Sequence, residues 1–111
     1  KLINNSGDIN LELGQWDAYD LPQDISAEES LTRLLNHMQG KDLFTKTQLM
    51  IGPGYSFRMI DTIVTNFHQP KSTLLLLVAA ATKGKWNQLY DYALANNFRF
   101  LSYGDSSIIH I

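Results

Sequence analysis

The sequence has 111 residues and a formal net charge of −2, with 44% apolar residues, 18% charged residues and no cysteine. This length fits one small domain with a real core, and the composition excludes a disordered chain. The lack of cysteine excludes disulfides, thiolate metal ligands and thiol nucleophiles. No apolar run approaches the roughly 18 residues that a membrane-spanning helix needs. The chain starts with neither a methionine nor a signal peptide, so we expect it to be part of a longer protein.

The charges are unevenly spread along the chain. Residues 1–47 hold four basic and eight acidic residues, whereas residues 48–111 hold five basic and three acidic ones. An anionic partner would therefore bind the second part, although ordinary solvated charges explain the same mild asymmetry.

The first part of the chain predicts loops followed by one helix. Residues 1–25 are rich in turn formers, with one short strand expected at Ile9–Leu13. Ser26 and Glu29 have the spacing of a capping box, in which each side chain bonds a free backbone N–H group. Apolar residues at helical spacing follow, and Gly40 predicts the end of the helix. The expected apolar face consists of Ala27, Leu31, Leu34, Leu35 and Met38.

The second part of the chain mixes expected strands and helices. In chain order these are extended segments at 48–51 and 55–57, a strand at 60–64, helices at 72–83 and 86–94, and strands at 98–102 and 107–111. The apolar run Leu74–Ala81 predicts that the first of these helices is fully buried. This mixture predicts an α/β fold with a layered α/β/α core, loop-rich over 1–25 and compact over 26–111. Ligands of such folds bind at the carboxyl ends of strands, near helix N-termini.

Polar groups are concentrated in Thr65–Leu77, where a strand is expected to end and a helix to begin. Ser72 and Thr73 would offer hydroxyls and backbone N–H groups to an anion, with Lys71 beside them. A simple N-cap with Pro70 at the helix entry and a solvated lysine explains the same residues, and both interpretations stay open. Both glycines of a phosphate-binding P-loop are missing, which excludes a nucleoside triphosphatase of that type.

Isolated groups elsewhere have a functional and a packing interpretation. His68 could act as an acid, a base or a hydrogen-bond donor, or be an ordinary histidine packed in a loop. Tyr55 could stack on a base and Arg58 could meet a phosphate, whereas we expect Phe57 in the core. Arg99–Asp105 ends an expected strand with polar groups that could bind a ligand, and an ordinary turn explains the same residues. No histidine spacing is typical of a metal site, so none is expected.

Three motifs in a fixed order make the second part of the chain more specific. They are PGY-x-F at Pro53–Phe57, D-x-x-x-TNFH-x-PKSTLL at Asp61–Leu75, and RF-x-SYGD at Arg99–Asp105. In this combination, residues 48–111 resemble the carboxy-terminal part of the S-adenosylmethionine:tRNA ribosyltransferase-isomerase family of queuosine biosynthesis. Two departures from that pattern are Gln69 in place of leucine and Ser106-Ser107 in place of a small and an apolar residue.

The resemblance implies a larger two-domain protein, in which an α/β core carries an inserted β-barrel domain that this chain lacks. It implies a cytoplasmic enzyme that transfers and isomerises the ribosyl group of S-adenosylmethionine onto 7-aminomethyl-7-deazaguanine in tRNA. The products would be epoxyqueuosine-modified tRNA, adenine and methionine, and neither a metal nor a membrane is implied. We expect a monomer, and we expect this chain alone to be inactive.

The same resemblance suggests roles for the polar residues. His68 is the candidate for a proton transfer, and Asp61 or Asp105 would balance the sulfonium charge or bind ribose hydroxyls. The candidates for substrate binding are Tyr55, Arg58, Asn66, Lys71, Ser72, Thr73, Arg99, Ser102 and Tyr103. The basic members of this set would contact tRNA phosphates. The alternatives are a non-catalytic tRNA-binding module, a related enzyme with a changed substrate, or a purely structural fragment.

Overall fold

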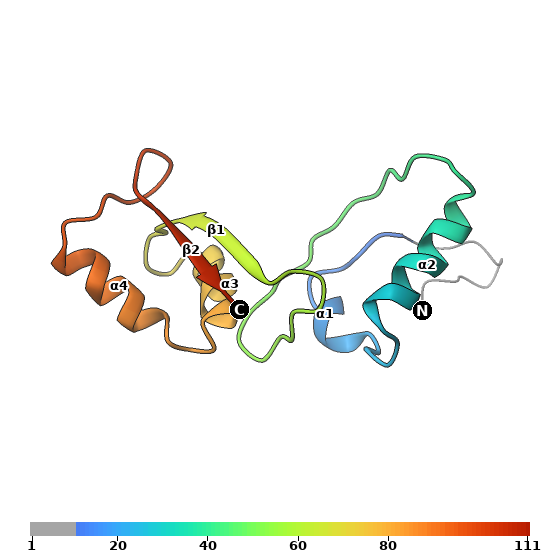
Figure 1. Ribbon diagram of the computed structural model, residues 1–111, viewed down its shortest axis with the longest axis horizontal. Helices are drawn as coiled ribbons and strands as arrows, with labels where there is room; N and C mark the ends of the chain where they lie inside the picture. The colour runs from blue at the N-terminus through green and yellow to red at the C-terminus, as the bar shows by residue number, and fades with distance from the viewer. Residues whose placement is uncertain (1–10) are drawn as a thin grey trace. The chain divides into compact units, whose positions relative to one another are not determined.

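The computed structural model describes residues 11–111, which form two compact units that divide between Met50 and Ile51. The sequence predicted one compact core over 26–111, whereas the structure groups residues before and after this boundary separately. The elements are α1 (Asp17–Asp20), α2 (Ala27–Met38), β1 (Thr62–Asn66), α3 (Thr73–Ala81), α4 (Trp86–Ala95) and β2 (Ser106–His110) (Figure 1).

In the first unit, residues 11–15 lie beside residues 45–50. The N–H of Leu13 donates to the carbonyl of Lys46 (3.2 Å), and the N–H of Gln48 donates to the carbonyl of Leu13 (2.9 Å). Leu13 and Thr47 form an isolated parallel bridge, with no longer ladder among the described residues of this unit. The strand predicted at Ile9–Leu13 lies partly outside the described residues, and its described part contributes only this bridge.

The short helix α1 was not predicted from the sequence. It begins where the N–H of Gly14 donates to Oδ2 of Asp17 (2.7 Å), a local bond that turns the chain before the helix. Ala18 is its buried residue. Because α1 has only four residues, it carries no hydrophobic periodicity that a sequence could reveal.

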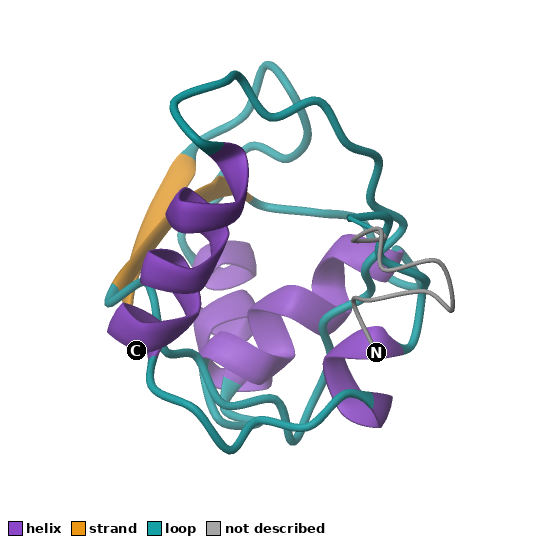
Figure 2. Cartoon of the chain, turned by 90° about the vertical axis from the view of Figure 1, so that its right-hand side faces the viewer, coloured by secondary structure: helices purple, strands orange, loops and turns teal. Residues whose placement is uncertain are grey.

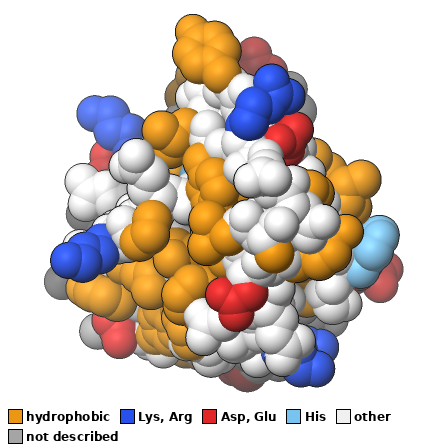
Figure 3. All heavy atoms as spheres, turned by 90° about the vertical axis from the view of Figure 1, so that its left-hand side faces the viewer, with side chains coloured by type: hydrophobic (Ala, Val, Ile, Leu, Met, Phe, Trp, Pro, Cys, Tyr) orange, Lys and Arg blue, Asp and Glu red, His pale blue; other side chains and the backbone are white. Residues whose placement is uncertain are grey.

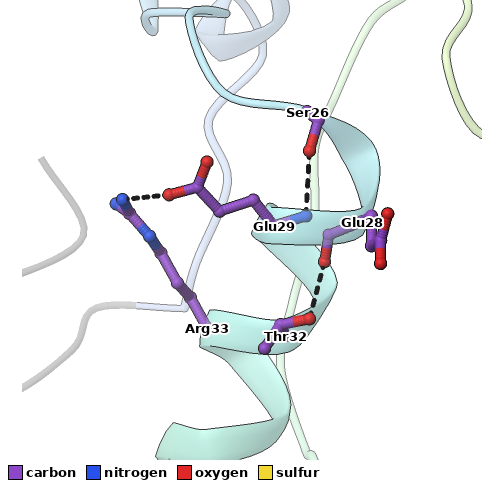
Figure 4. A network of polar contacts seen from close by, with 5 residues as sticks. All are labelled: Ser26, Glu28, Glu29, Thr32 and Arg33. Atoms are coloured by element: carbon purple, nitrogen blue, oxygen red, sulfur yellow. Dashed lines mark hydrogen bonds and ion pairs between the residues drawn. The ribbon is translucent and has the colours of Figure 1, made fainter.

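Helix α2 confirms the predicted helix, but only half of its capping box forms (Figure 4). The Ser26 hydroxyl accepts a hydrogen bond from the N–H of Glu29 (3.1 Å). The Glu29 carboxylate pairs with Arg33 one turn later instead of returning to the backbone at Ser26. The helix ends with Gln39 and Gly40 in the left-handed region, at φ values of 50° and 76°.

The predicted apolar face of α2 is not buried in this unit. Leu31 is 47% exposed, Leu35 is 70% exposed, and no residue of α2 is buried. Helical periodicity therefore predicted the helix correctly. It did not predict that the apolar face stays uncovered within this unit.

In the second unit, β1 and β2 form a two-stranded antiparallel sheet, and the strands lie side by side in two views (Figures 1 and 2). Their register pairs Ile63 with Ile109 and Val64 with Ile108. Ile109 belongs to the core, whereas Val64 and Ile108 are 68% and 66% exposed on the other face. Both strands were predicted, with their bounds shifted by one or two residues, and the α/β class is confirmed.

The strand predicted at 98–102 is wrong, because this segment forms a closed loop. The N–H of Arg99 donates to Oδ2 of Asp105 (2.7 Å), and the N–H of Gly104 donates to the carbonyl of Leu101 (2.9 Å). Leu101 adopts a left-handed φ of 68°, which a strand does not allow. The segments 48–51 and 55–57, which were predicted as short extended pieces, belong to neither a helix nor a strand.

Helices α3 and α4 enclose the core of this unit with the two strands. The core consists of Phe67, Val78, Ala81, Tyr90, Ala93 and Ile109. The prediction of a fully buried α3 holds only for its second half, since Leu74 is 50% exposed and Leu76 is 39% exposed. Apolar side chains are also visible among polar ones on the face drawn in Figure 3.

Candidate functional site

The loop that follows β1 is fixed at three points. The Thr65 hydroxyl lies 2.8 Å from Nε2 of His68, and the N–H of His68 donates to the Tyr90 hydroxyl (2.9 Å). The carbonyl of Phe67 accepts a hydrogen bond from the N–H of Leu101 (2.9 Å). Bonds to β1, to α4 and to the loop after α4 therefore hold the half-buried His68 in place.

The two serines at the start of β2 brace the end of β1. The Ser106 hydroxyl donates to Oδ1 of Asn66 (2.7 Å), and the Ser107 hydroxyl donates to the carbonyl of Thr65 (3.2 Å). Ser106 bonds to Oδ1 of Asn66, and the amide N–H₂ group of Asn66, which has no hydrogen bond within residues 11–111, can donate to a ligand. These serines are the residues that depart from the motif pattern, and they contact the motif directly.

Asp105 closes the neighbouring loop through Arg99. Its carboxylate accepts hydrogen bonds from the backbone N–H of Arg99 (2.7 Å) and from Nη2 of Arg99 (3.3 Å). These bonds, backbone first, and the guanidinium charge lower the pKa of Asp105 below its usual value, against a smaller desolvation effect. Asp105 is therefore ionised at neutral pH and offers a negative charge or an acceptor, not an acidic proton.

Gly104 is required in this loop by a close approach of the backbone. A Cβ atom at position 104 would lie 2.5 Å from the carbonyl oxygen of Arg99 and 2.6 Å from the carbonyl carbon of Phe100. Any side chain at this position would therefore force the loop open.

The N-terminus of α3 lies after the same loop. The Ser72 hydroxyl accepts a hydrogen bond from the N–H of Leu74 (3.2 Å), so the capping interpretation is confirmed. Lys71 is exposed and adopts a left-handed φ of 66°, and Thr73 begins the helix. An anion at this terminus stays a prediction.

The segments that carry TNFH, RF and SYGD thus meet at one end of the β1–β2 pair. Asn66, His68, Arg99 and Asp105 lie in these segments. Ser102 and Tyr103 belong to the same loop but are exposed, Tyr103 by 95%.

Asp61 does not join this group within the chain. It precedes β1, and its carbonyl accepts from the N–H of Ile111 (2.9 Å) at the other end of the strand pair. Five residues of extended strand place it roughly 16 Å from Asn66 along β1. Asp61 therefore does not lie in one site with His68 and Asp105.

Tyr55 lies elsewhere too, at a surface hollow of about 710 Å³. The hollow is lined by the Pro53–Phe57 turn, the end of α3, Lys83-Gly84 and Ile111. Tyr55 and Phe57 make an edge-to-face contact there with ring centroids 5.2 Å apart, and Phe57 packs against the core as predicted. Nine helical residues, about 13 Å, separate the two ends of α3. The Tyr55 end of the unit is thus distinct from the His68 end.

Sequence reasoning missed three residues that hold the His68 loop. Thr65 is the first residue of TNFH and Ser106 follows SYGD, and their hydroxyls were the available signal. Tyr90 lies in α4 and is only 7% exposed, yet its hydroxyl bonds to the backbone of His68.

No helix within residues 11–111 is long and apolar enough to cross a membrane. In the same range, no three His, Cys, Asp or Glu residues are grouped so that they could hold a metal ion.

Comparison with known proteins identifies the family. The model of the family described as queuosine biosynthesis protein matches residues 19–109. The chain belongs to this family. It is 45% identical over 83 residues to an S-adenosylmethionine:tRNA ribosyltransferase-isomerase of Chlorobaculum parvum, a match that covers 74% of this chain and 24% of the relative. It is 51% identical over 65 residues to one of Acidiphilium cryptum, covering 58% of this chain and 19% of the relative.

A solved structure supports the same family. The crystal structure of the S-adenosylmethionine tRNA ribosyltransferase of Thermotoga maritima superposes with a TM-score of 0.56 at 33% identity, covering 87% of this chain and 31% of that one. This chain spans between 18% and 27% of the length of the curated queuosine biosynthesis relatives that it matches. The resemblance of the three motifs to the family is thereby confirmed.

Proposed function

We propose that the protein containing this chain is an S-adenosylmethionine:tRNA ribosyltransferase-isomerase. Its substrates are S-adenosylmethionine, as the ribosyl donor, and a tRNA that carries 7-aminomethyl-7-deazaguanine. Its products are epoxyqueuosine-modified tRNA, adenine and methionine. It acts in the cytoplasm as a monomer, and this chain contributes one wall of its active site.

One observation carries the proposal. The polar residues of the family-matching motifs meet at one end of the strand pair, where His68 is held by hydrogen bonds from two directions. A rigid, half-buried imidazole next to an exposed loop suits proton transfer, because catalysis requires a group that is already oriented.

The chemistry assigns a task to each part of this arrangement. The sulfonium acidifies the adjacent ribose carbon, so a base must remove a proton there, and adenine must accept a proton as it leaves. His68 performs one of these transfers. The Asp105 carboxylate, ionised at neutral pH, balances the sulfonium charge or accepts from ribose hydroxyls.

The remaining candidates bind the substrates at their edges. The amide of Asn66 and the hydroxyls of Ser72, Thr73 and Tyr103 bind the methionine carboxylate or the ribose. The basic residues contact tRNA phosphates, Lys71 and Arg99 near this end and Arg58 beyond Tyr55. Asp61 precedes β1, at the end away from Asn66, and therefore acts on another part of the substrates.

The test uses the full-length protein with S-adenosylmethionine and precursor-bearing tRNA, and it measures released adenine. His68→Ala should lower turnover by about 10²-fold or more, since general acid–base catalysis contributes that much. His110→Ala is the matched control, because His110 is an exposed histidine of the same unit at the other end of the strand pair. Absence of adenine release by the wild type contradicts the proposed function, and near-normal turnover of His68→Ala contradicts the role of His68. Residues 1–111 alone should release none.

A further inference from the structure

Thr65 and His68 form a hydrogen-bonded pair to which the proposed function gives no role. Thr65 is the fourth residue of β1, and its hydroxyl lies 2.8 Å from Nε2 of the imidazole. The next contact of this hydroxyl, to the carbonyl of Asn66, is much longer at 3.4 Å. The histidine is therefore the main partner of the Thr65 hydroxyl.

A hydroxyl suits a ring that gains and loses a proton. A ring that exchanges a proton at Nδ1 keeps its proton on Nε2 in both charge states, and the hydroxyl oxygen can accept from that N–H in both. The ring is thus held in one orientation in either protonation state. A carboxylate partner would favour the protonated ring, and a backbone N–H could not pair with an Nε2 that carries a proton.

The second ring nitrogen has no such partner. Within residues 11–111, no hydrogen bond involves Nδ1 of His68. The backbone of the same residue is fixed independently by the Tyr90 hydroxyl. The ring is therefore anchored on its Nε2 side, and its Nδ1 side is the one available to a ligand.

We propose that Thr65 is a positioning residue that holds Nε2 of His68, so that Nδ1 is the nitrogen that exchanges a proton with the substrate. This inference rests on the proposed function, since it names the atom through which His68 acts. The proton moves between Nδ1 and the substrate, while Nε2 keeps its proton and donates it in a hydrogen bond to the Thr65 hydroxyl in both charge states of the ring.

The chain offers a matched control for this pair. The Thr62 hydroxyl lies 3.1 Å from Nδ1 of His110, which repeats the threonine–histidine contact at the other end of the same strand pair. Thr62→Val and Thr65→Val remove the same hydroxyl and keep the β-branched shape that suits a strand. Only Thr65→Val touches the proposed site.

The experiment measures steady-state adenine release by the full-length protein. Thr65→Val should lower kcat about tenfold with little change in KM, which is the usual scale for one lost hydrogen bond. Thr65→Ser should restore kcat to within about twofold, and Thr62→Val should match the wild type. In a His68→Ala background, Thr65→Val should change kcat by less than about twofold, because the threonine acts through the ring.

Three outcomes overturn the proposal: a wild-type kcat in Thr65→Val, equal losses in the valine and serine variants, or a full additional loss in the His68→Ala background. Failure of the proposed function is recognised separately, because the wild type then releases no adenine. In that case, ¹⁵N NMR spectra of the protein with labelled histidine test the positioning role of Thr65. Ring signals of His68 that differ between the wild type and Thr65→Val support the positioning role, and identical signals overturn it.

Discussion

Replacing Phe67 by alanine should open the core of the second unit and release the His68 loop. Phe67 is 2% exposed, and its ring contacts Tyr90, Phe98 and Phe100 at centroid distances of 5.4, 5.6 and 5.6 Å. A buried Phe→Ala change costs about 3–5 kcal/mol. We expect the upper part of that range, because each edge-to-face aromatic pair adds roughly 0.5–1.5 kcal/mol beyond its buried area.

Hydrogen exchange of the β1 and β2 amides in the full-length protein measures this loss. Their protection should fall by roughly two to three and a half orders of magnitude, since about 1.4 kcal/mol corresponds to a factor of ten. Tyr103→Ala is the control, because Tyr103 is 95% exposed and a surface change costs within about 0.5 kcal/mol. A loss below about 1 kcal/mol in Phe67→Ala would refute the packing argument.

Three further predictions concern the loops around this core. The lowered pKa of Asp105 means that its stabilisation is present above the unfolded value of about 3.9 and is lost as the pH falls through the lower folded value. In urea melts, Asp105→Asn should therefore remove the part of the stability loss at acidic pH that comes from protonation of Asp105. A variant whose stability depends on pH as that of the wild type does would contradict this prediction. Gly104→Ala should destabilise the 99–105 loop and lower adenine release, because its Cβ would lie 2.5 Å from a backbone oxygen; a wild-type melt would show that the loop adapts. Ser72→Ala should cost about 1 kcal/mol by loss of the N-cap. Ser72→Asp should restore stability. If Ser72 also binds the methionine carboxylate, as the proposed function has it, the added charge should repel that group and leave activity low, whereas recovery of both would leave capping as the only role of Ser72.

Local chemistry made several elements predictable from the sequence. Ser26 and the apolar spacing behind it specify α2, and the β-branched run before Asn66 specifies β1. The short α1 and the 98–102 loop escaped prediction for different reasons. The first has too few residues for a period, and the second is apolar enough for a strand but is closed by the Asp105 carboxylate.

The candidate site shows the same division. The motifs identified His68, Asn66 and Asp105 as residues of one family pattern, because motif residues are read directly from the chain. The sequence could not show that Asp61 lies at the far end of β1, nor that Tyr55 lines a hollow at the other end of α3.

The sequence by itself determined the family, the helices with clear periodicity and the polar residues at the end of β1. Only the tertiary structure decided which of these residues meet. Hydrogen bonds between segments about 40 residues apart, such as Ser106 to Asn66, depend on strand register, which no local pattern encodes. The hydroxyls of Thr65 and Tyr90 acquire their importance in the same way, because a side chain can fix His68 only after the chain has folded.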